Sequence, residues 1–427
     1  MVGIIGLKQL KVLHILQNYE PSKGGTQFLF KNVSEILVRK FKDEVIIFTT
    51  NSMFDPGGNR FKLIGPEFEI LNNVKIYRFP FYRFHRGFLK IINKILFKIL
   101  GLNSKYISRK RLGPWAPKLE DSLNNIKCDV ICGSSSQYSF MSYGSQRKLN
   151  INRKPFVFMG AIHFDNEENI SLSKHILNNI INSDKYIANT SFERDCLIEC
   201  GIEPTKIDVI GCGVNINEFG LSHQNEARKH FGIGENEFVI GYVGRFAVNK
   251  DIKTLIKAFS KNYQVNWRLV LAGGQNEYLG YLKSYIKEYH NNIADKIIFI
   301  VDFDDTLKEK IYSSLDLFVC PSYSESFGIV FLEAWASKLP VIGTNIGAIR
   351  TIITENYNGR LFAVSNSIQL GDLINYYYKN AEIRIEHGLA GFELIQRNFT
   401  WEIIAEKYRN TYSEAVRIFN AKESCVV

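Results

Sequence analysis

Two glutamates and two basic residues are the best candidates for chemistry in the second half of this 427-residue sequence. Glu325 and Glu333 are eight residues apart, and Arg245 and Lys250 are five residues apart. Two carboxylates can bind different hydroxyls of one polyol ligand. Arg with Lys suits a diphosphate, because Arg forms bidentate hydrogen bonds and Lys supplies a point charge.

The segment around the glutamates predicts a strand, a loop and a helix. Residues 315–320 form a short apolar run, typical of a buried parallel strand, and residues 327–338 follow a helical pattern that Pro340 closes. The start of this helix offers free backbone N–H groups to an anion, and a glycine there lets a ligand approach closely. Between the two glutamates, the residues at this helix start are Ser326, Phe327, Gly328 and Ile329.

Short apolar runs alternate with helical stretches along the whole chain, which predicts an α/β protein with doubly wound parallel sheets. The length suits two domains of roughly 200 residues, each with its own core. We expect an N-terminal Rossmann-like domain over residues 1–212, a second over residues 213–400 and a C-terminal helix within residues 401–427.

Two features of the first half lie at predicted strand ends. The strand 11–16, a loop with Gly24 and Gly25, and a helix together have the shape of a phosphate cradle, although paired glycines also occur in many ordinary turns. His163 follows the strand 156–159, where a lone histidine is more often a structural residue than a functional one.

One long pattern resembles a known family. The stretch Pro321-Ser-x-x-Glu325-Ser-Phe-Gly-x-x-x-x-Glu333-Ala-x-Ala-x-x-x-Pro340 is similar to the signature of the group 1 (family 4) retaining glycosyltransferases. The resemblance implies a GT-B fold, in which two Rossmann-like doubly wound domains face each other across a cleft. It also implies that the C-terminal helix crosses back to the first domain.

The resemblance also implies roles for residues. Glu333 would hold the ribose of a nucleotide sugar, and Glu325 the hydroxyls of the transferred sugar. Arg245 and Lys250 would hold the diphosphate. The set expected to bind the donor is completed by Gly24, Gly25, Ser326, Phe327, Gly328 and Ile329, and His163 would reach the donor sugar.

The chain departs from the family pattern at several positions. Gln27 replaces a glutamate, Asp251 replaces a glycine after the lysine, and Val301 replaces a glycine near the nucleobase. Ala348 and Thr351 replace the second glycine and the glutamate of a further loop. These departures leave the nucleobase and the shape of two turns open.

The implied function is retaining transfer of a sugar from a UDP- or GDP-sugar to a saccharide or lipid-linked acceptor hydroxyl. Polysaccharide or glycolipid assembly at the cell surface is the expected setting. We expect no cofactor and no metal. A nucleotide-sugar 2-epimerase, an inactive GT-B partner of an assembly complex, a glycosidase, and a metal-dependent transferase using Asp302-Phe303-Asp304 remain alternatives.

Positive charge is concentrated in one stretch. Residues 78–111 contain ten Lys or Arg and no acidic residue, whereas the whole chain has a net charge of +10. A local basic patch indicates a local anionic partner and not a nucleic-acid-binding protein. Within 83–111, the lysines Lys90, Lys94 and Lys98 share one face of a predicted helix 88–100, with isoleucines on the other.

This helix predicts either contact with an anionic membrane surface or an ordinary helix whose apolar side is in the core. The sequence has no long apolar segment that would span a bilayer, and its seven cysteines suggest reduced thiols. We therefore expect a cytoplasmic protein, peripheral at the cytoplasmic membrane face if the helix binds lipid.

Overall fold

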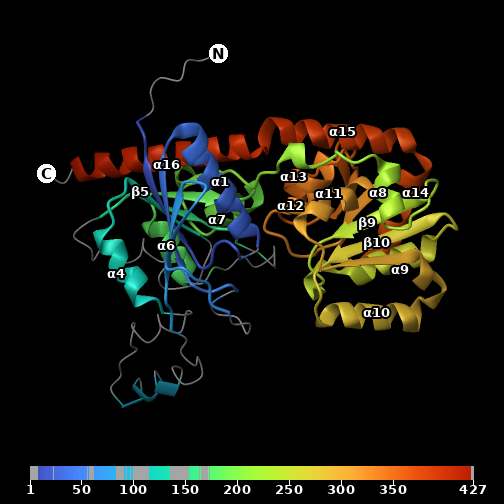
Figure 1. The fold of residues 1–427 in the computed structure, drawn as a ribbon, viewed down its shortest axis with the longest axis horizontal. Coiled ribbons are helices and arrows are strands. Elements are labelled where there is room, and N and C mark those ends of the chain that lie inside the picture. The colour runs from blue at the N-terminus through green and yellow to red at the C-terminus, as the bar shows by residue number, and fades with distance from the viewer. Residues whose placement is uncertain are drawn as a thin grey trace.

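The computed structural model describes residues 8–22, 24–54, 56, 62–82, 91, 92, 94–96, 98, 99, 115–134, 153–162, 164, 172 and 174–424. Within these residues the chain forms two parallel sheets with helices against them. Figure 1 shows the sheets side by side, with the long helices α15 and α16 along one side of both.

The first sheet has the strand order β3-β4-β2-β1-β5-β6-β7-β8, and every described pair is parallel except β3 with β4. Its central strands are buried along almost their whole length, as expected when helices cover both faces. The strands are β1 (Lys11–Leu16), β2 (Glu44–Thr50), β3 (Phe68–Leu71), β4 (Val74–Phe79), β5 (Val130–Ser134), β6 (Phe156–Met159), β7 (Lys185–Ala188) and β8 (Ile207–Val209).

The second sheet is parallel throughout, in the order β11-β10-β9-β12-β13-β14. Its strands are β9 (Phe238–Val243), β10 (Trp267–Gly273), β11 (Ile297–Val301), β12 (Leu317–Cys320), β13 (Val341–Thr344) and β14 (Gly359–Phe362).

The direction of winding reverses once in each sheet. In the second sheet the reversal lies between β9 and β12, which are adjacent but separated in sequence by β10 and β11. In the first sheet it lies between β1 and β5. Open α/β sheets bind ligands beyond the carboxyl ends of the strands at such switch points. The loops after β1, β9 and β12 are therefore the expected ligand-binding loops.

The described helices follow the strands in the alternation that the sequence predicted. They are α1 (Gly25–Phe41), α4 (Pro117–Asn125), α6 (Lys174–Asn182), α7 (Ser191–Glu199), α8 (Gln224–His230), α9 (Ile252–Asn262), α10 (Glu277–Tyr289), α11 (Asp305–Ser313), α12 (Ile329–Ala336), α13 (Ile349–Ile352), α14 (Ser367–Lys379), α15 (Ala381–Asn398) and α16 (Trp401–Ser424).

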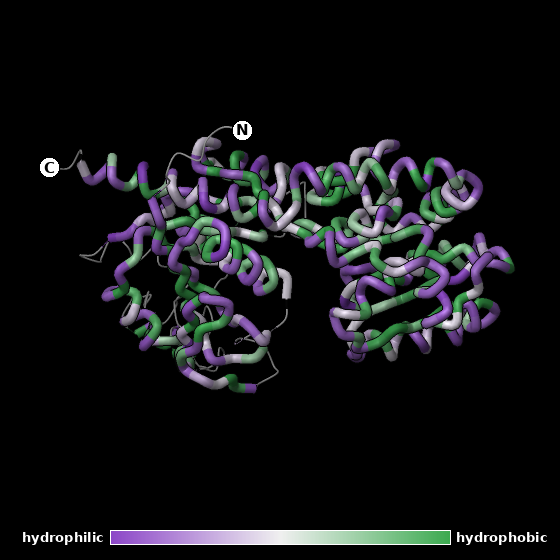
Figure 2. Tube along the Cα trace, turned by 45° about the horizontal axis from the view of Figure 1, so that its top comes forward, coloured by the Kyte–Doolittle hydropathy of each residue, from purple (hydrophilic) through white to green (hydrophobic). Residues whose placement is uncertain are grey.

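The last two helices, α15 and α16, pack against different domains. Gly388 and Gly391 of α15 lie against the second domain, where a Cβ at Gly391 would come within 2.0 Å of the Trp335 ring. Helix α16 packs against the first domain, and Arg409 pairs with Asp43 at 2.8 Å with both side chains buried. Hydrophilic and hydrophobic residues alternate along α16 (Figure 2), as a helix needs when one face is buried.

The chain passes between the domains at two neighbouring points. The Val214 N–H donates to the Phe399 carbonyl at 2.8 Å, and Val214 forms a parallel bridge with Thr400. The crossing of the final helix back to the first domain is thus confirmed. The boundaries at 212 and 400 stay predictions. The stretch 211–235 contains helix α8.

The basic segment lies partly outside the described residues, including Lys90 and Arg83. Its described residues 91, 92, 94–96, 98 and 99 are helical, and the helix projects from the first domain at the lower edge of Figure 1. Ile91, Ile95 and Ile99 are 58%, 49% and 72% exposed. The prediction that the apolar side of this helix lies in the core is therefore wrong at these positions. Arg78, in contrast, is buried and pairs with Glu69.

Candidate functional site

The loop between β12 and α12 is shaped by one glycine. Gly328 has φ 98°, in the left-handed region that favours glycine, and a Cβ there would lie 2.8 Å from the Phe331 ring. Helix α12 starts directly after it, and its N-cap residue makes no side-chain hydrogen bond to the first turn. The Phe331 N–H donates to the Gly328 carbonyl at 3.0 Å, and the N–H groups before it suit an anionic ligand.

The loop after β9 is tied to the loop after β12. The Tyr323 N–H and the Ser322 hydroxyl both donate to the Asn249 carbonyl, at 3.0 and 3.1 Å. This brings Lys250 against Glu325, and their Nζ and Oε1 atoms are 2.5 Å apart. Each side chain is 12% exposed, so the pair is largely shielded from water. The structure thus joins two predicted site residues from adjacent strands.

The turn that carries Lys250 keeps its shape without the glycine of the family pattern. Asp251 adopts a left-handed conformation with φ 44°, and its carboxylate accepts hydrogen bonds from Thr254 and Ser365 at 2.8 and 2.7 Å. Aspartate tolerates this region better than most residues, and the two bonds stabilise it.

Arg245 stands at the carboxyl end of β9. The Tyr242 hydroxyl donates to the Arg245 carbonyl at 2.7 Å and fixes the backbone there. The Arg245 side chain is exposed, and within the described part of the chain it has no ion pair. The exposed guanidinium is therefore available to an anionic ligand.

Glu333 is buried in α12 and already has two partners. Lys308 donates to its Oε1 at 2.8 Å and Tyr312 to its Oε2 at 2.9 Å. Burial lowers the pKa of Lys308, but the charge and hydrogen bond of Glu333 outweigh this, and the pKa ends above its ordinary value. A carboxylate has about four lone-pair sites, so Glu333 can still accept from a ribose hydroxyl.

Sequence reasoning missed both partners of Glu333. Lys308 and Tyr312 are four residues apart on α11 and therefore share one face of that helix. This spacing was visible in the sequence. The pairing with Glu333 was not, because it depends on how α11 and α12 pack around β12.

The first domain supplies the opposite side of the site. A Cβ at Gly25 would lie 3.7 Å from the Ile329 side chain, so these two predicted residues meet across the domains. Gln27, which stands where the family has a glutamate, is buried and donates to Asn18. The side of the site that the first domain supplies thus carries the uncharged amide side chains of Gln27 and Asn18 next to the glycine pair.

Phe327 uses its side chain for structure. The ring is 3% exposed, lies 5.8 Å from the Phe399 ring and would meet a Cβ at Gly211 at 2.7 Å. It packs at the crossing between the domains, so only its backbone is available to a ligand.

His163 lies outside the described residues, but the residue before it is held by a buried carboxylate. Glu193 of α7 accepts from the Tyr186 hydroxyl at 2.5 Å, the Asn189 N–H at 2.8 Å and the Ile162 N–H at 3.3 Å. Burial raises the pKa of Glu193 to about 7. Nothing in the sequence pattern marked Glu193 as a residue that anchors this loop.

The two aspartates of the D-x-D alternative have local structural roles. Asp304 caps α11 by accepting from the Thr306 and Leu307 N–H groups. Asp302 accepts from the Gln275 N–H at 2.7 Å. Among the described residues, no group of three or more potential ligands could hold a metal ion.

Comparison with known proteins agrees with this site. Residues 223–388 match the family model "Glycosyl transferases group 1". D-inositol 3-phosphate glycosyltransferase of Corynebacterium diphtheriae is 26% identical over 246 residues, which is 56% of this chain and 57% of that protein. N-acetyl-alpha-D-glucosaminyl L-malate synthase of Bacillus anthracis is 28% identical over 193 residues, which is 45% of this chain and 49% of that protein. The chain thus spans about half the length of the curated relatives it matches.

Solved structures show the fold over nearly the whole chain. Sucrose-phosphate synthase of Thermosynechococcus elongatus has a TM-score of 0.73 at 18% identity, covering 97% of this chain and all of that one. Anabaena Alr3699/HepE in complex with UDP and glucose has a TM-score of 0.70 at 18% identity, and the match covers 95% of this chain and 100% of that one. The two facing Rossmann-like domains are therefore a GT-B fold, as predicted.

Proposed function

We propose that this chain, whose residues 223–388 belong to the group 1 glycosyltransferases, transfers a sugar from a nucleotide diphosphate sugar to an acceptor hydroxyl. The observation that carries the proposal is the contact of Lys250 with Glu325 at the switch point between β9 and β12. Arg245 follows β9, and Glu333 lies in the helix that follows β12. A relative of the same fold binds UDP and glucose, which supports a UDP-sugar as donor.

Each group has a task in this reaction. Arg245, Lys250 and the N-terminus of α12 would bind the diphosphate and stabilise the negative charge that develops on it as the sugar leaves. Glu333 would accept hydrogen bonds from the ribose hydroxyls. Glu325 would accept from hydroxyls of the sugar. The leaving phosphate can take the acceptor proton, so no protein base is assigned.

The family signature supports retention of the anomeric configuration. Proton NMR of the first product formed from UDP-glucose, or from another donor that is turned over, tests this. We expect the donor's configuration in the product. An inverted product would contradict the family 4 assignment, and turnover of a nucleotide sugar without any acceptor would favour the 2-epimerase.

We further propose that the helix around residues 91–99 binds an anionic membrane surface. Its isoleucines Ile91, Ile95 and Ile99 are exposed, Lys94 and Lys98 beside them are exposed as well, and residues 78–111 lack any acidic residue. Apolar residues in the acyl boundary and lysines near acidic headgroups stabilise such a contact, at about 1 kcal/mol per basic residue. No described helix is long and apolar enough to cross a bilayer.

Liposome sedimentation tests the membrane proposal. The parent chain should bind vesicles containing phosphatidylserine and not vesicles of phosphatidylcholine alone, and salt should weaken the binding. Ile95→Glu with Ile99→Glu should abolish it. Ile368→Glu, at a 63% exposed position on α14, is the matched control and should bind normally. Equal binding to both vesicle types would contradict the proposal.

A further inference from the structure

The second domain has a cavity on the side of its sheet away from the proposed reaction. It has a volume of about 560 Å³. Its floor is formed by Leu315 and Asp316, just before β12, and by Leu339 and Pro340, just before β13. These residues lie at the amino ends of the strands, whereas Glu325 follows a carboxyl end. The cavity is therefore separate from the cleft.

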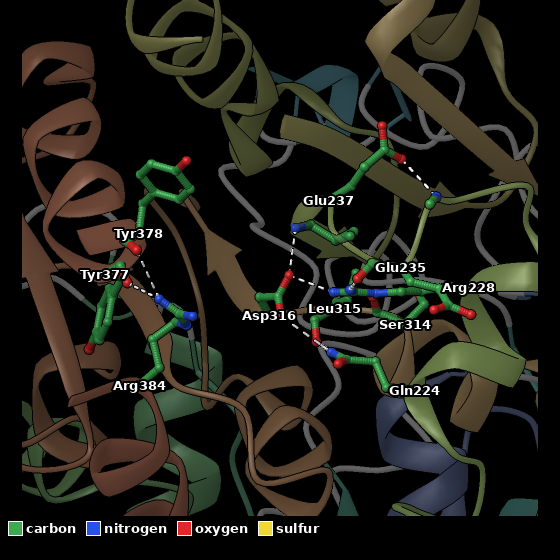
Figure 3. Close-up of polar contacts among 12 residues, drawn as sticks. Gln224, Arg228, Glu235, Glu237, Ser314, Leu315, Asp316, Tyr377, Tyr378 and Arg384 are labelled. Atoms are coloured by element: carbon green, nitrogen blue, oxygen red, sulfur yellow. Dashed lines mark hydrogen bonds and ion pairs between the residues drawn. The ribbon is translucent and has the colours of Figure 1, made fainter. Parts of the chain in front are cut away.

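One wall presents a fixed carboxylate. Asp316 Oδ2 accepts from Arg228 at 2.6 Å and from the Val239 N–H at 2.7 Å. Its Oδ1 has one partner among the described residues, the Gln224 side chain at 3.3 Å. Figure 3 shows this network around Asp316. Oδ1 therefore keeps the capacity to accept a further hydrogen bond.

The opposite wall presents a fixed guanidinium. Arg384, in the first turn of α15, donates through Nη1 to the carbonyls of Tyr377 and Tyr378. Its plane also lies 5.2 Å from the Phe238 ring centre. The Nε and Nη2 donors have no partner within the described residues. In Figure 3 Arg384 lies with Tyr377 and Tyr378 to the left of Asp316, and no dashed line joins Arg384 to Asp316.

Lys338 adds a further charge at the exposed edge of the cavity, where its Nζ lies 5.2 Å from the Phe392 ring centre, and the rest of the lining is apolar or uncharged. Phe219 and Ile216 come from the connection between the domains, and Ile385 and Phe392 come from α15. A pocket of about 300–1,000 Å³ with apolar walls and a few fixed polar groups is typical of a small-molecule site.

The polar groups indicate the class of ligand. A hydroxyl can donate to Asp316 Oδ1 and accept from Arg384, and two neighbouring hydroxyls can use both walls at once. The ring C–H groups of a sugar match the apolar surfaces. The lining carries charges of both signs, with Asp316 paired to Arg228 and with Arg384 and Lys338 nearby. Such a mixture of donors and acceptors, beside apolar surfaces, suits a neutral polyhydroxylated ligand better than an ion of one sign.

We propose that this cavity binds a neutral oligosaccharide at a site separate from the catalytic cleft, between the interdomain connection and α15. The proposal does not depend on the reaction proposed above, because it rests on Asp316, Arg384 and the cavity alone.

Binding can be measured by saturation-transfer NMR with maltotriose, cellotriose and lactose as probes, and by phosphorus NMR with inorganic pyrophosphate. The Lys250→Ala variant, with its cleft impaired, is examined beside the parent chain. We expect at least one saccharide to bind both proteins alike. Binding of pyrophosphate alone, or of no saccharide, would overturn the proposal.

Two variants locate the bound saccharide. Arg384→Met removes the donors and keeps the apolar stem, and it should weaken binding by about tenfold or more, the loss expected for a charge-assisted hydrogen bond. Ala381→Trp fills the exposed rim of the cavity while keeping the Arg384 side chain in the sequence, and it should do the same. Ala421→Trp, at an exposed position of α16, is the control and should bind normally.

The outcomes separate this proposal from the catalytic one. Unchanged saccharide binding in both cavity variants would overturn the cavity site, whatever the activity. If Lys250→Ala loses sugar transfer but still binds the saccharide, the result would support both the cavity site and the proposed reaction. If Arg384→Met unfolds, Ala381→Trp decides, because Ala381 makes no hydrogen bond through its side chain.

Discussion

Lys250 and Glu325 form an ion pair, which changes what each substitution should do. Because both side chains are 12% exposed, the attraction between them is screened less than in a surface pair. A diphosphate that binds Lys250 therefore has to compete with Glu325 for the same ammonium group.

Glu325→Gln should bind free UDP at least as tightly as the parent, because Lys250 no longer has a competing carboxylate, while sugar transfer should fall strongly. Lys250→Ala should weaken UDP binding by about tenfold or more, since a charge-assisted contact is lost. Isothermal titration calorimetry measures both. Weaker UDP binding by Glu325→Gln would show that Glu325 assists the nucleotide itself.

The contact of Glu333 with Lys308 leads to a second prediction about single residues. The Glu333 side chain is 7% exposed and that of Lys308 is 27% exposed, so an unpaired Glu333 is the costlier of the two. Lys308→Met should lower the free energy of unfolding by about 3 kcal/mol, and Glu333→Gln by less. Urea unfolding at neutral pH compares them.

Nucleotide binding distinguishes the roles of the same two residues. Glu333→Gln should weaken UDP binding if Glu333 holds the ribose, whereas Lys308→Met should retain it. Equal UDP binding by Glu333→Gln and the parent would contradict the ribose role.

At the scale of elements, the start of α12 depends on Gly328. Gly328→Ala places a Cβ in a left-handed conformation and 2.8 Å from the Phe331 ring. The strain should lower the free energy of unfolding by about 1–3 kcal/mol and displace the N–H groups proposed to bind phosphate. Donor affinity, measured by calorimetry, should fall with it.

A glycine in open space gives the control. Gly280 lies within α10, and a Cβ there would meet nothing within 4 Å. Gly280→Ala should raise the free energy of unfolding by about 0.5–1 kcal/mol, because alanine favours a helix interior. If both variants lose stability alike, the left-handed conformation of Gly328 is not the cause.

The sequence allowed most strands and the fold to be predicted, because buried parallel strands are continuous apolar runs. The segment 11–16 coincided with β1, and 156–159 with β6. The short, partly exposed β3 lacked such a run and was missed. The contact of Lys250 with Glu325 was also missed, because it depends on two loops tied together through Asn249, 73 residues before Ser322.

At the scale of the whole molecule, α16 completes the first domain. His14 of β1 lies between Ser34 of α1 and Tyr412 of α16, with each ring nitrogen 2.9 Å from a hydroxyl oxygen. Burial lowers the pKa of His14 to about 3. The histidine therefore stays neutral when the folded chain is moderately acidified.

This burial predicts acid sensitivity. Below pH 6.5 the unfolded chain binds a proton at His14 that the folded chain does not, so stability falls as the pH falls toward 3. The loss is about 1.4 kcal/mol per pH unit. Between pH 7 and pH 5.5, the stability advantage of the parent over His14→Gln should shrink by about 1.4 kcal/mol. An advantage independent of pH would contradict a neutral buried His14. Glu193 titrates alike in the parent and in His14→Gln, so its contribution to the pH dependence cancels when the two proteins are compared.

The pairing of Arg409 with Asp43 has a consequence for biosynthesis. The first sheet is covered by a helix that follows the entire second domain in sequence, so Arg409 and Tyr412 leave the ribosome after that domain. While residues 213–400 emerge and fold, Asp43 and His14 lack these two partners. A nascent first domain is thus exposed to proteases and chaperones until α16 has been synthesised. Folding from the N-terminus cannot finish this domain before the other one.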